Sequence, residues 1–312
     1  MECLKALREN RFTIHSMNAN PTEQLFAEDW DTLIQRHNGH DWQLLRNMFI
    51  ELNFPIIEGQ SKNPLFAAAL RRGQLPPICE GEWIPANPEG VRLYLHPTPV
   101  GRLPVIECEA DEDFVRLMQS LVYRCEPRSV PDSRGAGLLK NYNNWARIRM
   151  RGGSIPKDST LYKDCIALLS HRYYSGTEPE LFGLTPQEWR LKSLVIRREH
   201  EAAHYMTQRY YHSAKSEIHD ELIADFMGLT AAFGFYEPNF LLAFLGLYPT
   251  YRKGGRLAHY LEKEGFDELC GTIVQAARSI GDCYEKTGCR MAAFHILCRT
   301  SVADMARGRF NC

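Results

Sequence analysis

The segment from Thr185 to Tyr211 restricts the fold more than any other, because its sequence is that of one long helix. It opens with Thr185-Pro186-Gln187-Glu188, a capping box with proline at the first helical position. Its second half contains His200-Glu201-Ala202-Ala203-His204. Histidines four residues apart lie on one helical face, about 5 to 6 Å apart at Cβ, so both rings can reach a single ion. The pattern therefore predicts a helix that offers two ligands to one metal.

Glu201 is the residue that gives this pattern a chemical meaning. It follows the first histidine and so lies about 100° further round the helix, beside the ligands but displaced from them. Zinc lowers the pKa of a bound water towards about 7, and a carboxylate in this position can take the proton. An HExxH pattern arises by chance in about 2 to 3% of chains with this many histidines. A third ligand is therefore needed before the motif indicates a metal site.

The next predicted helix, from about residue 216 to residue 233, supplies candidates for that ligand. A catalytic zinc usually has three protein ligands and one open position. The extended pattern HExxHxxGxxH is excluded, because the chain has Thr207 and Tyr210 where that pattern needs glycine and histidine. Glu221 and Asp225 lie one turn apart on the next helix and therefore share a face.

Small residues follow on that same face. Gly228 and Ala232 continue the stripe of Glu221 and Asp225, so the two helices can approach closely enough to share a metal. HExxH on one helix followed by ExxxD on the next resembles the gluzincin group of zinc metallopeptidases. The resemblance covers about residues 196 to 229.

The resemblance implies a zincin-like fold and one Zn²⁺ per chain. The implied metal ligands are His200, His204 and Glu221. Glu201 would be the general base, and Asp225 would hold the other ring nitrogen of a ligand histidine. The sixteen residues between the second histidine and the ExxxD glutamate are fewer than in the best-known members. His219 and Asp220 therefore stay open as alternative third ligands.

Stabilising a transition state in such a site needs a donor aimed at the developing oxyanion. The segment 248–263 offers three candidate catalytic residues after a glycine pair, namely Arg256, His259 and Tyr260. A surface turn followed by an ordinary amphipathic helix would explain the same residues. Arg197 and Arg198, just before the first histidine, are expected on a solvated helix face and not at a phosphate site.

The chain as a whole is expected to be α+β. Residues 1–157 should form a mixed part with a small mixed sheet, and residues 158–312 a mainly helical part that carries both motif helices. Short β-rich segments bounded by proline and glycine predict strands at 78–84, 91–96 and 103–109, and an edge strand within 130–145. Helices are also expected at 20–39, 41–52, 63–73, 111–123, 237–248, 254–264, 266–286 and 290–306.

Composition and sequence pattern argue against several binding partners and cellular locations. Among 312 residues, 37 Lys and Arg nearly balance 38 Asp and Glu, so neither nucleic acid nor an anionic membrane is expected as a partner. The longest apolar run, residues 240–248, is far shorter than the roughly 20 residues of a membrane span. The first residues lack the apolar segment of a signal peptide, and the ten cysteines include no CxxC pair. We therefore expect a cytoplasmic protein with reduced thiols.

These features together predict a zinc-dependent hydrolase, and specifically a peptidase that cleaves an intracellular protein or peptide. The substrate could add as an extra strand beside residues 133–141, where a plain connecting loop is the alternative. Two other functions fit the same ligands: a metal hydrolase of another amide or ester, and a zinc-binding interaction or regulatory protein without turnover. The sequence does not indicate an oligomeric state.

Overall fold

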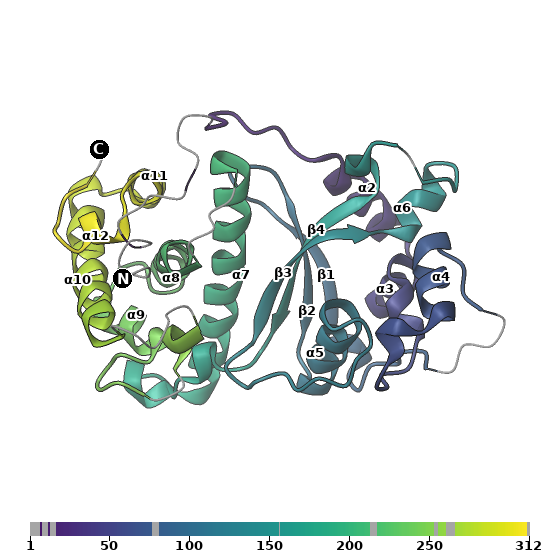
Figure 1. Cartoon of the computed structure of the whole chain (residues 1–312), viewed down its shortest axis with the longest axis horizontal. Helices are drawn as coiled ribbons and strands as arrows, with labels where there is room; N and C mark the ends of the chain where they lie inside the picture. The colour runs from purple at the N-terminus through teal and green to yellow at the C-terminus, as the bar shows by residue number, and fades with distance from the viewer. Residues whose placement is uncertain are drawn as a thin grey trace. The chain divides into compact units, whose positions relative to one another are not determined.

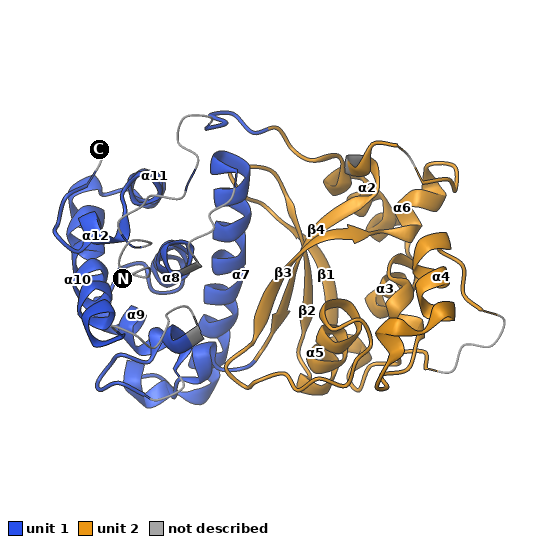
Figure 2. Cartoon of the chain, in the orientation of Figure 1, with its two compact units in different colours: residues 1–21, 172–312 blue, residues 22–171 orange. Residues whose placement is uncertain are grey.

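The computed structural model describes residues 7, 12, 17–76, 81–155, 157–212, 217–252, 255–259 and 266–310, except the side chains of Thr160, Glu217 and His259. The chain is α+β and consists of two compact units, coloured separately in Figure 2. Unit 1 comprises Met1–Pro21 and Arg172–Cys312, and unit 2 comprises Thr22–His171. This division differs from the expected boundary between residues 157 and 158, because a strand that follows this boundary pairs with the sheet of unit 2.

Unit 2 is built on a small mixed sheet of four strands in the order β1-β2-β4-β3 (Figure 1). The strands are β1 (Val91–His96), β2 (Leu103–Cys108), β3 (Ala136–Asn143) and β4 (Lys163–Ser170). The pairs β1–β2 and β3–β4 are antiparallel, and β2–β4 is parallel. All six residues of β2 are buried, as expected for a central strand.

The structure confirms some of the predicted strands but not all of them. The strands expected at 91–96 and 103–109 are confirmed, and β3 is an edge strand as expected, with a bulge between Lys140 and Tyr142. Residues 81–84 form no strand, and the rest of the segment expected at 78–84 lies outside the described residues. The mainly helical part expected from residue 158 did not include β4, because a short apolar run does not reveal by its period whether it is strand or helix.

Five α-helices of unit 2 are α2 (Leu25–Arg36), α3 (Asp41–Met48), α4 (Pro64–Arg72), α5 (Asp111–Leu117) and α6 (Trp145–Met150). Helices α2 and α3 contact β1, whereas α5 contacts β2 and β4. Helix α4 begins as the sequence indicates, because the Asn63 side chain accepts a hydrogen bond of 2.8 Å from the Leu65 amide. The segment expected as helix at 111–123 changes after α5 into a π-helical turn, η5 (Met118–Val122).

A buried ionic network connects α2, α6 and β4 in the core of unit 2. The fully buried Arg147 donates to Asp29 at 2.8 Å and also to Asp164. Asp164 also accepts from the Trp30 indole at 2.6 Å and from the Asn144 amide at 2.8 Å. Burial raises the pKa of Asp164 to about 6, although these partners act in the opposite direction. The network satisfies two carboxylates that would otherwise be costly to bury.

Unit 1 is helical in its described part. Its α-helices are α7 (Pro186–Tyr211), α8 (Glu217–Phe233), α9 (Pro238–Leu245), α10 (Phe266–Thr287), α11 (Arg290–Arg299) and α12 (Val302–Met305). The helix expected at 290–306 is interrupted, because Ser301 caps α12. Only η9 (Arg256–His259) of the helix expected at 254–264 falls on described residues. No helix in the described ranges is long and apolar enough to cross a membrane.

Helix α7 is the longest helix described and carries the predicted capping box. Glu188 donates its amide to the Thr185 hydroxyl at 3.3 Å, and its carboxylate accepts from the Thr185 amide at 2.9 Å. Helix α8 packs against α7. The amino-terminal stretch of the chain also reaches α7, where the Asn18 amide donates to the Tyr210 carbonyl at 2.9 Å and the Phe12 ring lies 5.8 Å from that of Tyr211.

Candidate metal centre

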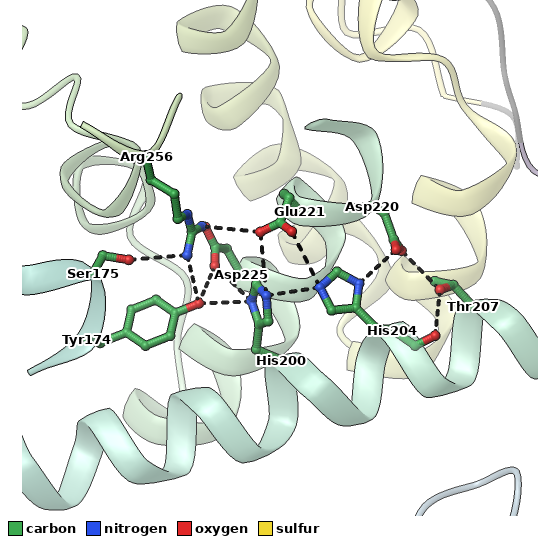
Figure 3. A network of polar contacts seen from close by, with 9 residues as sticks. All are labelled: Tyr174, Ser175, His200, His204, Thr207, Asp220, Glu221, Asp225 and Arg256. Carbon is green, nitrogen blue, oxygen red and sulfur yellow. Dashed lines mark hydrogen bonds and ion pairs between the residues drawn. The ribbon is translucent and has the colours of Figure 1, made fainter. Parts of the chain in front are cut away.

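Three side chains from α7 and α8 meet at one point in unit 1 (Figure 3). One ligand atom each from His200, His204 and Glu221 lies within 4.8 Å of the other two. The two Nε2 atoms are 3.0 Å apart, and each is 3.5 Å from an oxygen of Glu221. The structure therefore brings together the two histidines and the glutamate that the sequence indicated as ligands.

The other ring nitrogen of His200 is held by two partners. Its Nδ1 lies 3.0 Å from an oxygen of Asp225 and 2.8 Å from the hydroxyl of Tyr174. That hydroxyl itself donates to the same Asp225 oxygen at 2.6 Å. A proton on Nδ1 therefore faces two acceptors, which leaves the lone pair of the ring on Nε2.

The other ring nitrogen of His204 has a matching arrangement with different residues. Its Nδ1 lies 2.7 Å from an oxygen of Asp220, whose second oxygen accepts from the Thr207 hydroxyl at 2.9 Å. Both histidines thus present Nε2 towards Glu221. Two lone pairs 3.0 Å apart repel each other, so this geometry requires a proton or a metal cation between the rings.

The electrostatics of the cluster favour positive charge at that point. Burial lowers the pKa of His204, but the carboxylates of Asp220 and Glu221 raise it by more, to well above its usual range. Burial raises the pKa of Glu221, but its hydrogen bond with His204 and the charges of His200 and Arg256 hold it well below its usual range. Glu221 is therefore an ionised carboxylate, which is the form that binds a metal.

Arg256 lies at the edge of the cluster, on η9. Its guanidinium donates to Asp225, to the Tyr174 hydroxyl at 3.1 Å and to the Ser175 hydroxyl at 3.1 Å, and lies 3.8 Å from Glu221 (Figure 3). Ser175 has a left-handed backbone with φ 53°. The structure thus gives Arg256 the position of a cation that balances two carboxylates. Its expected action on an oxyanion stays a prediction.

The other candidate catalytic residues have different outcomes. Glu201 is buried on α7, directly after the first histidine, with 6% of its surface exposed. The backbone of His259 ends η9, but its side chain and the whole of Tyr260 lie outside the described residues. Their expected roles stay predictions.

The two alternative third ligands have other partners. Asp220 faces Nδ1 of His204 and not the point where the Nε2 atoms meet. His219 is buried, with its Nε2 3.0 Å from the Leu297 carbonyl, and burial lowers its pKa to about 4. Glu221 is therefore the third residue of the described cluster.

Arg197 corrects an expectation about the helix face before the motif. It is 1% exposed, not solvated, and donates to the backbone carbonyls of Arg172 and of Tyr173, the latter at 2.7 Å. Burial lowers the pKa of Arg197 to about 9. Its guanidinium lies 5.6 Å from the centre of the Tyr174 ring, so Arg197 braces the turn that directs Tyr174 at His200.

Three contacts of the candidate metal centre were not predicted. Tyr174 lies far before the motif in sequence and reaches His200 only through tertiary packing, so no local pattern indicates it. Asp220 was considered as a ligand and not as the acceptor for His204, although its position beside Glu221 is a signal for that role. Thr207 sits where the excluded histidine-rich pattern needs glycine, yet it contacts Asp220.

Comparisons with known proteins give the chain a family. A model for a family of unknown function, DUF7005, matches residues 1–307. Neither the curated proteins nor the solved structures gave a match. Because the match spans nearly the whole chain, this protein belongs to the family of unknown function DUF7005.

Proposed function

We propose that this protein is a zinc-dependent hydrolase with a zincin-like arrangement, and that its substrate is a protein or peptide. The observation that carries the proposal is the convergence of His200, His204 and Glu221 within 4.8 Å, with the Nδ1 atom of each histidine on a carboxylate. Zinc-binding histidines almost always donate their other nitrogen to a carboxylate, carbonyl or water. A solvated, charged helix face does not explain why both histidines of one cluster have a carboxylate at Nδ1.

The donor set suits zinc among the common metals. Two imidazole nitrogens and one carboxylate form the ligand set of a known class of catalytic zinc sites, in which a fourth position takes water or substrate. Imidazole favours zinc and other late transition metals over magnesium or calcium, which prefer oxygen. Both histidines and Glu221 are largely buried, so the protein and not bulk water sets the geometry of the donors.

A bound zinc would supply a Lewis acid that activates water and polarises a carbonyl. Residues of the chain would transfer the proton, orient the ligands and balance the charge. Glu201, next to His200 on α7, would accept a proton at its carboxylate and deliver it to the leaving amine. Asp225 and Asp220 would fix the orientation of the imidazoles. Arg256 would offset the negative charge of Asp225 and Glu221.

Metal analysis of the purified protein tests the metal centre. We expect one zinc per chain in the wild type and its loss in His204→Ala and in Glu221→Ala. His40→Ala is the matched control, because His40 is an exposed histidine of unit 2 and its loss should leave the zinc content unchanged. A wild-type chain that binds no zinc when zinc is in excess would overturn the proposal.

Hydrolysis tests the role of Glu201 separately. Glu201→Gln should retain zinc and lose cleavage of a diverse peptide mixture followed by mass spectrometry. The same preparations should be given simple amides and esters, because cleavage of these alone would assign another acyl substrate. A wild-type protein that holds zinc but cleaves nothing would instead favour a binding role, and unchanged turnover in Glu201→Gln would remove this residue from catalysis.

A further inference from the structure

Unit 2, which contains none of the metal-centre residues, has a cavity of its own. Its volume is about 580 Å³, within the range typical of small-molecule sites. It lies among η2 (Ile50–Asn53), α4, the bulged part of β3 and the start of β4. The lining residues that matter here are Glu51, Arg71, Arg124, Tyr142, Trp145 and Lys163.

The lining carries an excess of positive charge. Arg71, Arg124 and Lys163 are its cations, and Glu51 is its one acidic side chain. In the described part of the chain, neither Arg124 nor Lys163 forms an ion pair. Burial raises the pKa of Glu51 to about 7, although the charge of Arg124 opposes this shift. The lining therefore has more cations than anions, with Arg71 and Arg124 exposed to solvent and Lys163 partly buried.

Three irregular backbone segments border the same cavity. The π-helical turn η5 leads into Arg124 and Cys125, whose φ angles are 54° and 61°. Asn141, at the bulge of β3, has φ 63°. These are three of the five non-glycine residues with positive φ in the described ranges. π-Turns, bulges and left-handed residues gather at functional sites, because there the backbone is held against its local preference.

Aromatic side chains form the rest of the lining. They include Trp145, which is buried with 3% of its surface exposed, and Tyr142, which is partly buried. The charge of Arg124 lowers the pKa of both Tyr142 and Glu51, against the larger effect of burial. A ligand here would meet cations at one part of its surface and flat apolar rings at another. Arginine binds phosphate oxygens and also stacks on aromatic groups.

We propose that this cavity is a second ligand site, which binds a small phosphate monoester with an aromatic body. The phosphate would lie against Arg124 and Lys163, with Arg71 nearby, and the aromatic body against Tyr142 and Trp145. A dianion matches the charge of the lining better than a monoanion does. The proposal is independent of the metal centre, since all lining residues belong to unit 2.

Calorimetric titration of the full chain with phenyl phosphate tests the site. We expect saturable binding of one phenyl phosphate per chain, weaker binding of benzoate and none of benzyl alcohol. Arg124→Gln and Lys163→Gln should each weaken phenyl phosphate binding about tenfold. Glu51→Gln should strengthen it. Arg72→Gln is the matched control, because Arg72 is an exposed arginine next to Arg71 that does not line the cavity.

The results distinguish specific binding in this cavity from the absence of a binding site. Absence of saturable phenyl phosphate binding, or equal affinity in the wild type, Arg124→Gln and Lys163→Gln, would overturn the proposal. Equal affinity for inorganic phosphate and phenyl phosphate would overturn the aromatic part of the ligand. Zinc content, measured on the same samples, should be the same in all these variants. A failure of this site is therefore distinguishable from a failure of the metal centre.

Discussion

A Cβ atom added to Gly228 would lie 2.8 Å from the carbonyl oxygen of Ile196, so α7 and α8 approach more closely than a side chain allows. We predict that Gly228→Ala forces the helices apart and lowers the free energy of unfolding by about 1 to 3 kcal/mol. Because the proposed zinc ligands come from both helices, zinc affinity should fall as well. Urea unfolding and zinc titration would measure the two effects.

Gly271→Ala is the matched control for that change. Gly271 lies in α10, and nothing lies within 4 Å of an added Cβ there. Alanine should be neutral or stabilise by up to about 1 kcal/mol, since it favours helix. If the two variants had the same stability and zinc affinity, close packing at Gly228 would not matter.

The hydroxyl of Tyr174 is predicted to tune metal affinity. Tyr174→Phe removes the group that contacts both His200 and Asp225, so zinc affinity should fall about 10- to 100-fold. Tyr211→Phe removes a buried hydroxyl that contacts His295 instead, at 2.7 Å. Each variant should lose about 1 kcal/mol of stability, but only Tyr174→Phe should lose zinc affinity. Equal zinc affinity in both would show that Tyr174 only supports the fold.

Breaking the buried network of unit 2 should be costly. Arg147→Met leaves Asp29 and Asp164 without their buried cation, so we expect a loss of about 3 to 5 kcal/mol in the free energy of unfolding. Arg102→Met, which removes a partly exposed partner of Glu23 and Asp31, should cost about 1 kcal/mol or less. If Arg147→Met and Arg102→Met lowered the free energy of unfolding by the same amount in urea, burial of the ion pairs would not determine their contribution.

Stability should depend on pH through Glu51. Its pKa is about 7 in the folded protein and near 4.5 when unfolded, so the folded state retains a proton that the unfolded chain loses. Stability from this group is complete below about pH 4.5 and is lost as pH rises through 7. Glu51→Gln should therefore be more stable than the wild type at pH 8, by at most about 3 kcal/mol, and no more stable at pH 4.

Unfolding curves in urea at pH 4, 6 and 8 would check this dependence. Glu58→Gln serves as the control, because Glu58 is an exposed glutamate of the same unit. The free energy of unfolding of Glu58→Gln should differ little from that of the wild type, and by the same amount at each pH. The prediction would be contradicted if the stability of Glu51→Gln relative to the wild type did not increase with pH.

Local periodicity explains which parts of the site could be predicted. His200 and His204 share a helical face by spacing alone, and the same holds for Glu221 and Asp225, so each helix could be analysed separately. Gly228 continues that face, and its small size predicted the close approach of the two helices, which the structure has at Ile196. Helix starts with an explicit cap, such as Thr185 before α7, also followed from the sequence.

Contacts that depend on tertiary packing could not be predicted. Tyr174 precedes His200 by 26 residues and reaches it through tertiary packing, with Arg197 bound to the carbonyl of the preceding residue, Tyr173. A charged residue such as Arg197 is usually exposed, so its burial had no signal in the sequence. Strand β4 was missed for a related reason, since its apolar run becomes recognisable as a strand only when β2 and β3 flank it.

The amino-terminal stretch that contacts α7 has a consequence for synthesis of the chain. Asn18 and Phe12 emerge from the ribosome before unit 2, whereas their partners Tyr210 and Tyr211 follow only after all of unit 2. At translation rates of about 5 to 20 residues per second, about 10 to 40 seconds separate the two. All the metal-centre residues are also translated after unit 2. If the proposed site binds zinc, loading would therefore follow translation of unit 2 and of both ligand helices.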